Sequence, residues 1–544
     1  MKILDFGLEK KTGNITLDIL YALRKCKKES YDKIVFPKDI YDIDTTFCEQ
    51  RNLNISNHGL NGPKRIAVLV DGMQNFEIDF NGSTLLTHGI ITPIAIINSK
   101  NVKMSNVNLD NPQTLTMQAR IVSADETQIK VKIENGTENF VFRDGRIYAL
   151  NGKESMFLRQ NTIIEFNGKT GEIEHGTGDG VLGPADNLSY EKLDDDYLII
   201  RGANRVPRVG NVLILCTYFR AGVGIFAGDS KDLFFNNINI HACYGMGMLV
   251  QFCKNVTLDA VGTKRLNGRL FTANADATHF VGCSGLVKVE NCEFEGQYDD
   301  ALNIHGVFLR VIEKLNDKEL LIKLMHFQAT GLPVLHKGDR VQALEPSSLI
   351  PFTENKVSRV EIINDEVVRV EFENSVADIK VGDDLENLDT SPDLTFRKNI
   401  VRDNRARGIL IGAKGKVIIE ENYFHTAGAS ILFESDGKWW FESGGTTNVT
   451  IRNNHFDNCK HGTWGKAVIQ FVGREKVLPN KYYHQNVIVE NNKFDMYNDK
   501  AIIFDNIASV KVLNNQVAGK NANIDVIHCG KTDFQTDKFS YNVE

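Results

Sequence analysis

The chain has 544 residues and a formal net charge of −7, from 63 Lys and Arg against 70 Asp and Glu. This acidic balance lacks the basic surface of nucleic-acid-binding proteins, so we expect no nucleic-acid partner. The chain holds 44 Gly but only 11 Pro, and Asn is abundant, which favours a β-rich fold with many tight turns over a helical one.

Cysteine usage and hydropathy exclude two further classes. The nine cysteines are scattered without a Cys-x-x-Cys pair, which argues against a disulfide framework and against structural zinc. No run of about 20 apolar residues occurs, so we expect no membrane span. The sequence starts directly with the fold-like stretch Met1–Gly7, and no signal peptide is visible.

Residues 1–118 are expected to form an N-terminal cap and the first coils of a repeat. Apolar residues recur at helical spacing between residues 17 and 23 and run into the basic stretch 24–28, which favours a helix end. A short helix would cover the bare edge of the first coil. Two Asn-led stretches, 75–82 and 101–109, alternate apolar and polar residues, as strands with one buried face do.

Two stretches interrupt the coil pattern. Residues 119–200 and 306–390 each open with a hairpin-like pair of apolar runs followed by further short strands. We interpret both as inserted small β-barrel or sandwich modules. Irregular decoration on the coils is the alternative.

The coil pattern returns in residues 201–305 and 391–544. Four stretches, which start at Val417, Val449, Val487 and Val510, follow the template apolar–x–apolar–x–Asn–Asn–x–Phe, with Glu421 in place of the first Asn and Val517 in place of the Phe. The Asn suits a bend with left-handed backbone, where its amide can also bond the next coil, and the Phe suits an interior stack. This repeat predicts an all-β, right-handed parallel β-helix.

Three aspartates are the strongest candidates for catalysis. Asp299 and Asp300 follow Asp276 by 23 and 24 residues, about one coil, so their strands should stack roughly 4.8 Å apart. Both members of the doublet can face a ligand only if the chain bends, and Gly296 allows a bend. Repulsion should then raise one pKa, as an acid and base pair requires. A solvated turn or a calcium site is the alternative.

Polar side chains flank this patch. Asn274, Asn303 and His305 are candidates to hold sugar hydroxyls, although ordinary turn and ladder bonding explains them equally well. Arg269 and Arg407 are candidates to bind hydroxyls or to tune the carboxylates, with surface ion pairing as the alternative.

The stretch Trp439-Trp440-Phe441-Glu442 forms a second cluster. Adjacent Trp residues cannot both be buried on one face of a strand, so a stacking platform for a sugar ring is a reasonable interpretation. Glu442 is placed to anchor a pair of hydroxyls. The alternative is a loop that packs on the coils.

The spacing Asn274-x-Asp276, then Asp299-Asp300, resembles the carboxylate set of the polygalacturonase-type β-helix hydrolases. The fuller strings are closer to glycoside hydrolase family 110, the α-1,3-galactosidases, and the similarity runs through much of the chain. They are Arg269-Leu-Phe-Thr-Ala-Asn-Ala-Asp276-Ala-Thr-His-Phe, Asp299-Asp300-Ala-Leu-Asn303-Ile-His305-Gly and Trp439-Trp440-Phe441-Glu442-Ser443-Gly444.

The resemblance implies exo-removal of terminal α-1,3-linked galactose, of blood group B or linear type, with inversion and without metal or other cofactor. It implies that Asp299 is the general acid and that Asp276 with Asp300 activates the water. The partner would be a glycan with terminal galactose, which favours a periplasmic or secreted location, and the inserted modules are candidates to mediate a homodimer. Nothing resembles the basic residues that polygalacturonases use for uronate, so a neutral sugar is preferred.

Two other classes fit parts of the same pattern. A β-helix polysaccharide lyase would need a calcium cluster, or a Lys or Arg base facing an acidic sugar. A non-catalytic glycan-binding adhesin would bind glycan without releasing sugar, through the inserted modules.

Overall fold

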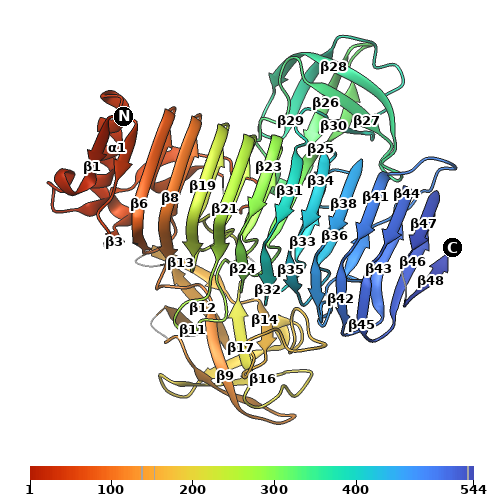
Figure 1. Cartoon of the computed structure of the whole chain (residues 1–544). Helices are drawn as coiled ribbons and strands as arrows, with labels where there is room; N and C mark the ends of the chain where they lie inside the picture. Colours follow the sequence, from red (N-terminus) through yellow and green to blue (C-terminus); the bar gives the residue numbers. More distant parts are fainter. Residues whose placement is uncertain (60, 137–138, 152–153, 218, 536–537, 544) are drawn as a thin grey trace.

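The structure is a computed structural model that describes residues 1–59, 61–136, 139–151, 154–217, 219–535 and 538–543. Two long parallel sheets run the length of the molecule, and the chain passes from one to the other within each coil (Figure 1). Two antiparallel modules project near the middle, one below and one above the coils in this view. The predicted parallel β-helix with inserted modules is confirmed.

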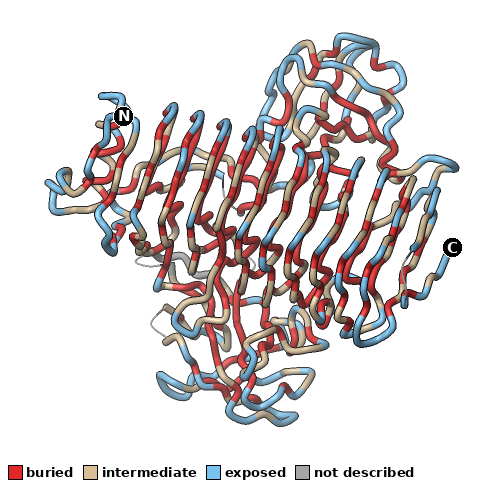
Figure 2. The backbone as a smooth tube through the Cα atoms, viewed as in Figure 1, coloured by how far each residue is buried: buried red, intermediate tan, exposed pale blue. Residues whose placement is uncertain are grey.

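Sheet A carries the first parallel set of strands, along which buried residues alternate with intermediate or exposed ones (Figure 2). It consists of β1 (Ile3–Asp5), β2 (Lys33–Val35), β3 (Ile40–Ile43), β6 (Gln74–Thr87), β8 (Lys100–Asp110), β19 (Lys231–Ile240), β21 (Lys254–Thr263), β23 (Ser284–Glu290), β24 (Glu293–Glu295), β31 (Asp393–Arg397), β32 (Ile400–Arg402), β34 (Lys416–Glu420), β35 (Tyr423–His425), β38 (Asn448–Arg452), β39 (His455–Asp457), β41 (His484–Glu490), β42 (Lys493–Met496), β44 (Ile507–Leu513), β45 (Gln516–Gly519) and β47 (Lys531–Gln535).

Sheet B is the second parallel set, and it carries the candidate site. It consists of β5 (Pro63–Asp71), β7 (Thr92–Ile97), β18 (Ile225–Gly228), β20 (Met248–Gln251), β22 (Thr278–Val281), β25 (Leu302–Lys314), β33 (Ile409–Ile411), β36 (Ile431–Phe433), β40 (Ile469–Phe471), β43 (Lys500–Asp505), β46 (Ala522–Ile527) and β48 (Phe539–Val543), with β4 (Glu49–Asn52) antiparallel to β5. Short 3-10 turns cover Phe6–Glu9, Thr45–Phe47, Ala185–Asn187 and Phe327–Ala329.

Helix α1 (Ile15–Lys28) covers the N-terminal end of the coils, as predicted. The Asn14 side chain accepts the N–H groups of Thr16 and Leu17, which otherwise lack partners at a helix start. The apolar face of α1 joins the same core as the coils. Among the described residues no helix has the length and apolar character to span a membrane, and all nine cysteines are free thiols.

The interior of sheet A holds the predicted aromatic stack. Phe294, Phe396, Phe424, Phe456 and Phe494 are buried, with successive ring centroids 6.4, 6.2, 5.3 and 4.8 Å apart. Each ring comes from a different coil, so the stack ties consecutive coils through packed apolar surface.

The two asparagines of the repeat have separate roles: the first forms the bend, and the second bonds the neighbouring coil. The first adopts left-handed backbone, with φ of +56° at Asn453 and +55° at Asn491. The second points inward and forms a ladder: Asn454 Nδ2 donates to the carbonyl of Ile419 at 2.9 Å, and Asn454 Oδ1 accepts the N–H of Asn422 at 3.0 Å. Each inward amide therefore bonds the coil before it.

The first module is an antiparallel sheet in the order β14, β17, β9, β10, β16, β15. Its strands are β9 (Met117–Ala124), β10 (Ile129–Ile133), β14 (Thr162–Phe166), β15 (Ser189–Lys192), β16 (Tyr197–Arg201) and β17 (Val212–Cys216), and a smaller sheet holds β11 (Phe140–Arg143), β12 (Arg146–Asn151) and β13 (Glu154–Arg159).

The second module is a closed antiparallel barrel in the order β25, β26, β29, β28, β27, β30 and back to β25. Its other strands are β26 (Glu319–Leu324), β27 (Arg340–Leu344), β28 (Pro351–Ile362), β29 (Val367–Phe372) and β30 (Asp384–Asn387). Strand β25 belongs to sheet B at its start and to the barrel at its end, and its centre pairs with the short strand β37 (Glu442–Ser443). One continuous strand thus joins the coils, the barrel and the Trp-Trp loop.

We expect Asn454→Ala to lower the free energy of unfolding by about 3 kcal/mol, since it leaves the buried N–H of Asn422 and the carbonyl of Ile419 unpaired, at about 1–3 kcal/mol per group. Urea denaturation measures the loss. Asn448→Ala, at an exposed position of the same coil, is the control and should change stability by no more than about 0.5 kcal/mol. Equal losses in both variants would contradict the ladder.

Candidate active site

The structure brings the three aspartates together. Asp276 and Asp300 each lie two residues before their strands, β22 and β25, which pair in register with Thr278 opposite Leu302. The N–H of Asp300 donates to Asp276 Oδ1 at 3.1 Å. One carboxylate oxygen from each of Asp276, Asp299 and Asp300 lies within 4.8 Å of the others. The one-coil offset therefore places them in one patch, as expected.

A bend between β24 and β25 presents the doublet. Gly296 has a φ of +71°, which favours glycine because it has no Cβ. The side chain of Asp299 is 17% exposed, whereas those of Asp276 and Asp300 are 3% and 0% exposed. Asp299 is thus the carboxylate of the group with access from outside.

Three arginines neutralise the patch. Arg407 forms two hydrogen bonds to Asp300, Nε to Oδ1 at 2.9 Å and a terminal nitrogen to Oδ2 at 2.8 Å, and it reaches Asp299 at 3.4 Å. Arg220 and Arg405 approach the carboxylate oxygens of Asp299 to 3.3 and 3.7 Å. Bidentate arginine–carboxylate pairs are strong and directional, so this network fixes the orientation of the doublet.

These charges separate the pKa values of the aspartates. Burial alone would raise the pKa of Asp299, but the positive charges of the three surrounding arginines outweigh it and hold that pKa below its ordinary value. Burial raises the pKa of Asp276 to about 7, and the negative charge of Asp299 adds to the effect. Burial also raises the pKa of Asp300, despite Arg407. Asp299 is therefore ionised before its two neighbours.

A chain of histidines leads away from Asp276. His279 Nδ1 lies 2.5 Å from Asp276 Oδ2, and His279 Nε2 lies 2.9 Å from His305 Nε2. His305 Nδ1 lies 2.6 Å from the carbonyl oxygen of Gly306, which only accepts, so His305 Nδ1 carries a hydrogen. His305 Nε2 then lies 3.4 Å from a carboxylate oxygen of Glu442.

The hydrogen bonds decide where the protons lie when both rings are neutral. Neutral His305 has a bare Nε2, which accepts from Nε2 of His279. Burial lowers the pKa of His279 well below its ordinary value, so this ring is neutral and its Nδ1 accepts. The hydrogen between His279 and Asp276 then comes from the carboxyl group, which matches the raised pKa of Asp276.

The Trp-Trp loop meets this chain at Glu442. Asn57 Nδ2 donates to Glu442 Oε1 at 3.1 Å. Burial would raise the pKa of Glu442, but the nearby His305 and His279 outweigh it and lower that pKa. Trp440 is 38% exposed with the Arg220 guanidinium 5.7 Å from its ring, whereas Trp439 is 67% exposed. The loop thus offers one aromatic ring and one carboxylate to the site.

A cavity of about 280 Å³ opens over Asp299. It is lined by both modules and by the coils, namely by Thr162, Cys216, Thr217, Arg220, Asn274, Ala275, Tyr298, Asp299, Gln328, Arg405 and Trp440. Asn274 Nδ2 donates to the carbonyls of Thr217 and Phe219. The Oδ1 atoms of Asn274 and Asn303 are buried without a hydrogen-bond partner among the described residues. Of these two residues, Asn274 lines the cavity and Asn303 does not.

Two family models match the inserted modules: GLAA-B beta-barrel domain I matches residues 117–213, and domain II matches residues 319–385. Alpha-1,3-galactosidase B of Bacteroides fragilis is 30% identical to this chain, over 98% of this chain and 94% of its own length. Alpha-1,3-galactosidase A of Shewanella woodyi is 30% identical, over 95% and 85%. The chain belongs to the α-1,3-galactosidase family. This is glycoside hydrolase family 110, as the sequence motifs indicated.

Among solved structures, a family 28 exopolygalacturonase of Yersinia enterocolitica aligns with this galactosidase-family chain at 12% identity. The alignment covers 100% of this chain and 78% of that chain, with a TM-score of 0.43.

The structure leaves two predicted residues outside the group: Trp439, which is largely exposed and does not line the cavity, and Arg269. Arg269 binds Asp110 Oδ1 at 2.6 Å and the carbonyls of Asn111 and Leu266 at 3.3 Å, and no described contact links it to the aspartates. It ties the loop before β22 to the chain that enters the first module. For Arg269 the ion-pairing alternative describes the observed contacts.

Sequence reasoning missed Arg220, Arg405 and His279. Arg405 precedes Arg407 by two residues, and His279 lies inside the Asp276 motif, so both positions carried a local signal. Arg220 follows the first module, and its position in the sequence carried no such signal. The arginines also bear on metal binding: their three positive charges already balance the carboxylates, which is the contribution that a bound cation would otherwise make.

We expect Asp276→Asn to remove a pH dependence of stability. Between about pH 4 and pH 7 the folded state keeps the proton on Asp276 while the unfolded state releases it, so wild-type stability falls as pH rises. Asn resembles the protonated carboxyl but does not titrate. Asp276→Asn therefore loses this pH-dependent contribution to the free energy of unfolding, which amounts to about 4 kcal/mol at most. Urea unfolding at pH 5 and pH 8 measures it. Parallel pH profiles of the two proteins would contradict the assignment.

Proposed function

We propose that this protein is an exo-acting, inverting α-galactosidase that hydrolyses terminal α-1,3-linked galactose from glycans of blood group B or linear type. The observation that carries the proposal is the cluster of Asp276, Asp299 and Asp300, of which Asp299 lines a small cavity. The names of the relatives, which are alpha-1,3-galactosidases, support the choice of sugar and linkage.

The size of the cavity supports exo action on a single sugar. Its volume of about 280 Å³ lies just below the usual range of ligand pockets, which is ~300–1,000 Å³. Trp440 and the two modules bound it, which favours one terminal residue over a continuous chain.

The pairing of the cationic groups supports a neutral substrate. Arg220, Arg405 and Arg407 all lie against Asp299, and Arg407 also clamps Asp300. A uronate would need a cation to balance its own carboxylate, and these arginines already serve the protein's carboxylates.

Asp299 is the proposed general acid, since it is the most exposed of the three carboxylates and lines the cavity. In the empty site its pKa is low, so the shared proton resides on Asp276 or Asp300. A bound galactose excludes water and raises the pKa of Asp299 from this low value, which moves the shared proton onto Asp299 and toward the glycosidic oxygen.

Asp276 and Asp300 are the proposed bases that activate the water. The proton that Asp276 removes from water replaces the one that Asp299 passed to the glycosidic oxygen, so the site regains the proton that it holds on Asp276 or Asp300 when empty. The Asp276 carboxyl then donates to His279 Nδ1, as in the empty site, and His279 Nε2 donates to His305 Nε2. The histidines hold the Asp276 side chain in place through these bonds.

Inversion is supported by the likeness of the Asn274-x-Asp276 and Asp299-Asp300 motifs to the polygalacturonase-type set. The carboxylate spacing gives a different indication. Inverting enzymes commonly hold acid and base ~6.5–9.5 Å apart and retaining enzymes ~5–5.5 Å, whereas oxygens here lie within 4.8 Å. The anomer that forms first is therefore the decisive measurement.

We expect proton NMR to show β-galactose as the first product from an α-1,3-galactosyl disaccharide and from the blood group B trisaccharide. Asp299→Asn should fold normally, by circular dichroism, and lose several orders of magnitude in kcat/KM. Asp495→Asn, on a distant coil, is the control and should keep full activity. Prompt α-galactose would overturn inversion, and binding without released sugar would leave a glycan-binding protein.

The two tryptophans are expected to differ. Trp440→Ala should raise KM by about tenfold, or about 1.4 kcal/mol, because its ring lines the cavity. Trp439→Ala is the matched control and should stay within about twofold of wild type, since its ring is largely exposed and does not line the cavity. Equal effects would show that the platform includes both rings.

A further inference from the structure

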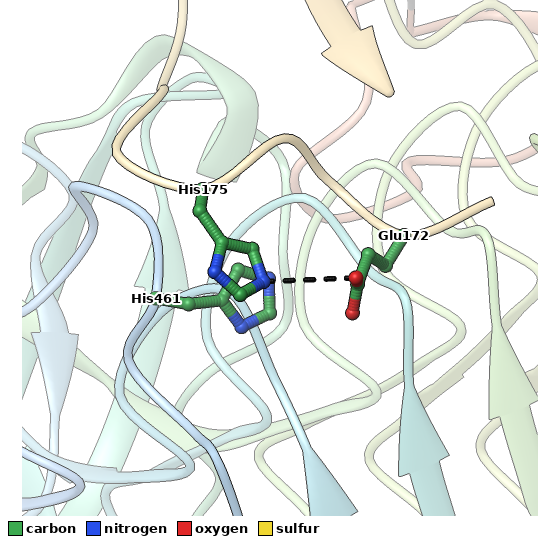
Figure 3. A group of neighbouring side chains, drawn as sticks. All are labelled: Glu172, His175 and His461. Atoms are coloured by element: carbon green, nitrogen blue, oxygen red, sulfur yellow. Dashed lines mark ion pairs between the residues drawn. The ribbon is translucent and has the colours of Figure 1, made fainter. Parts of the chain in front are cut away.

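We propose a zinc site outside the catalytic patch, formed by Glu172, His175 and His461. Glu172 and His175 lie on the strap, which we define as residues 167–183 between β14 and β15, and His461 follows β39 on a later coil. Figure 3 shows the three side chains converging from these two segments. One ligand atom from each lies within 4.8 Å of the others. The site does not depend on the proposed hydrolase activity.

The ring of His461 is held so that one nitrogen can bind a metal ion. Its side chain is buried, and its Nδ1 lies 3.3 Å from the carbonyl oxygen of Asn458, which only accepts. Nδ1 therefore carries the hydrogen, and Nε2 presents its lone pair. This Nε2 is buried without a hydrogen-bond partner among the described residues. Metal-binding histidines are commonly held in this way, with the other ring nitrogen bonded to a backbone carbonyl.

His175 presents a second nitrogen to the same point. Its Nε2 is also buried without a hydrogen-bond partner in the described chain, and it lies 3.6 Å from Glu172 Oε1. The rings of His175 and His461 are 4.5 Å apart and 25° from parallel. Zinc bonds of about 2.0–2.2 Å place ligand atoms roughly 3.4 Å apart in a tetrahedron, so small side-chain shifts complete the geometry.

Glu172 supplies the third ligand in its charged form. Its Oε2 accepts a hydrogen bond from His425 Nε2 at 2.7 Å, and its Oε1, which accepts from the Thr170 hydroxyl at 3.0 Å, keeps a second lone pair for the ion. That bond is the main cause that lowers the pKa of Glu172 to about 2, against the effect of burial. Two imidazoles and one carboxylate are a donor set that zinc prefers over magnesium or calcium, with a fourth position for water.

The ion would fix the strap against the coil. The N–H of Gly176 donates to the carbonyl of His461 at 2.7 Å, so strap and coil already touch beside the site. Further along the strap, Asp179 pairs with Arg405, which in turn reaches Asp299. A zinc ion bound here would hold the strap in place. Through the Asp179–Arg405 pair it would also hold one wall of the catalytic cavity.

Zinc chloride titrated into metal-stripped protein tests the proposal by calorimetry and by metal analysis after dialysis. We expect one equivalent of Zn²⁺ to bind wild type, and His175→Ala and His461→Ala to weaken binding by at least about tenfold. Zinc should raise the melting temperature of wild type by mass action, and not that of either variant. His175 is partly exposed, so His175→Ala should fold even if His461→Ala does not.

His455→Ala is the matched control, because His455, Asp457 and Asp495 form another cluster that could hold a metal ion. It should bind zinc as wild type does. The proposal is overturned if wild type binds no zinc, if both strap-site variants bind as wild type, or if binding falls only in His455→Ala. None of these readouts requires galactoside hydrolysis, so failure here and failure of the hydrolase proposal are distinguishable.

Discussion

The stacking of one coil on the next is the constraint on which this molecule depends. Parallel backbone ladders keep neighbouring strands about 4.8 Å apart, and they run from β5 to β48 with a register shift between Lys500 and Ile502. Side chains at equal positions of successive coils must therefore meet. The same rule stacks the phenylalanine rings, aligns the inward asparagines and places Asp276 beside Asp300.

Charge balance is the second condition for the site. Burying three carboxylates within 4.8 Å of one another is costly unless positive groups accompany them. Arg220 supplies one of these groups from the stretch after the first module, and Arg405 and Arg407 supply the others from one loop before β33. Their placement lowers the pKa of Asp299, while burial raises those of Asp276 and Asp300. One patch thus contains a carboxylate that ionises readily beside two that bind a proton more tightly.

The inserted modules turn an open coil surface into a cavity. Thr162 and Thr217 come from the first module and its exit, Gln328 comes from the second, and Trp440 comes from a loop on the coils. Strand β25 couples these parts, because it passes from the Asp doublet through Asn303 and His305 into the barrel. The cavity wall and the catalytic aspartates are therefore parts of one connected structure.

The sequence by itself determined the repeat and its periodic contacts. Alternation and the Asn-Asn-x-Phe template specify strands, bends and the interior stack, because these depend on local spacing. The one-coil offset also located the three aspartates and, with the family motifs, Trp440 and Glu442. Arg407 was identified as a candidate, but its bond to Asp300 was not.

Only the tertiary structure decided which distant groups surround the carboxylates. Arg220 lies 79 residues from Asp299, and His461 lies more than 280 residues from His175 and Glu172. Arg269 belongs to the family motif that contains Asp276, yet its side chain pairs with the carboxylate of Asp110 and not with an aspartate of the site. Such pairings depend on how two long insertions fold back onto the coils. Local sequence spacing does not specify how these insertions fold back. The burial that shifts the pKa of each aspartate arises only in the complete fold.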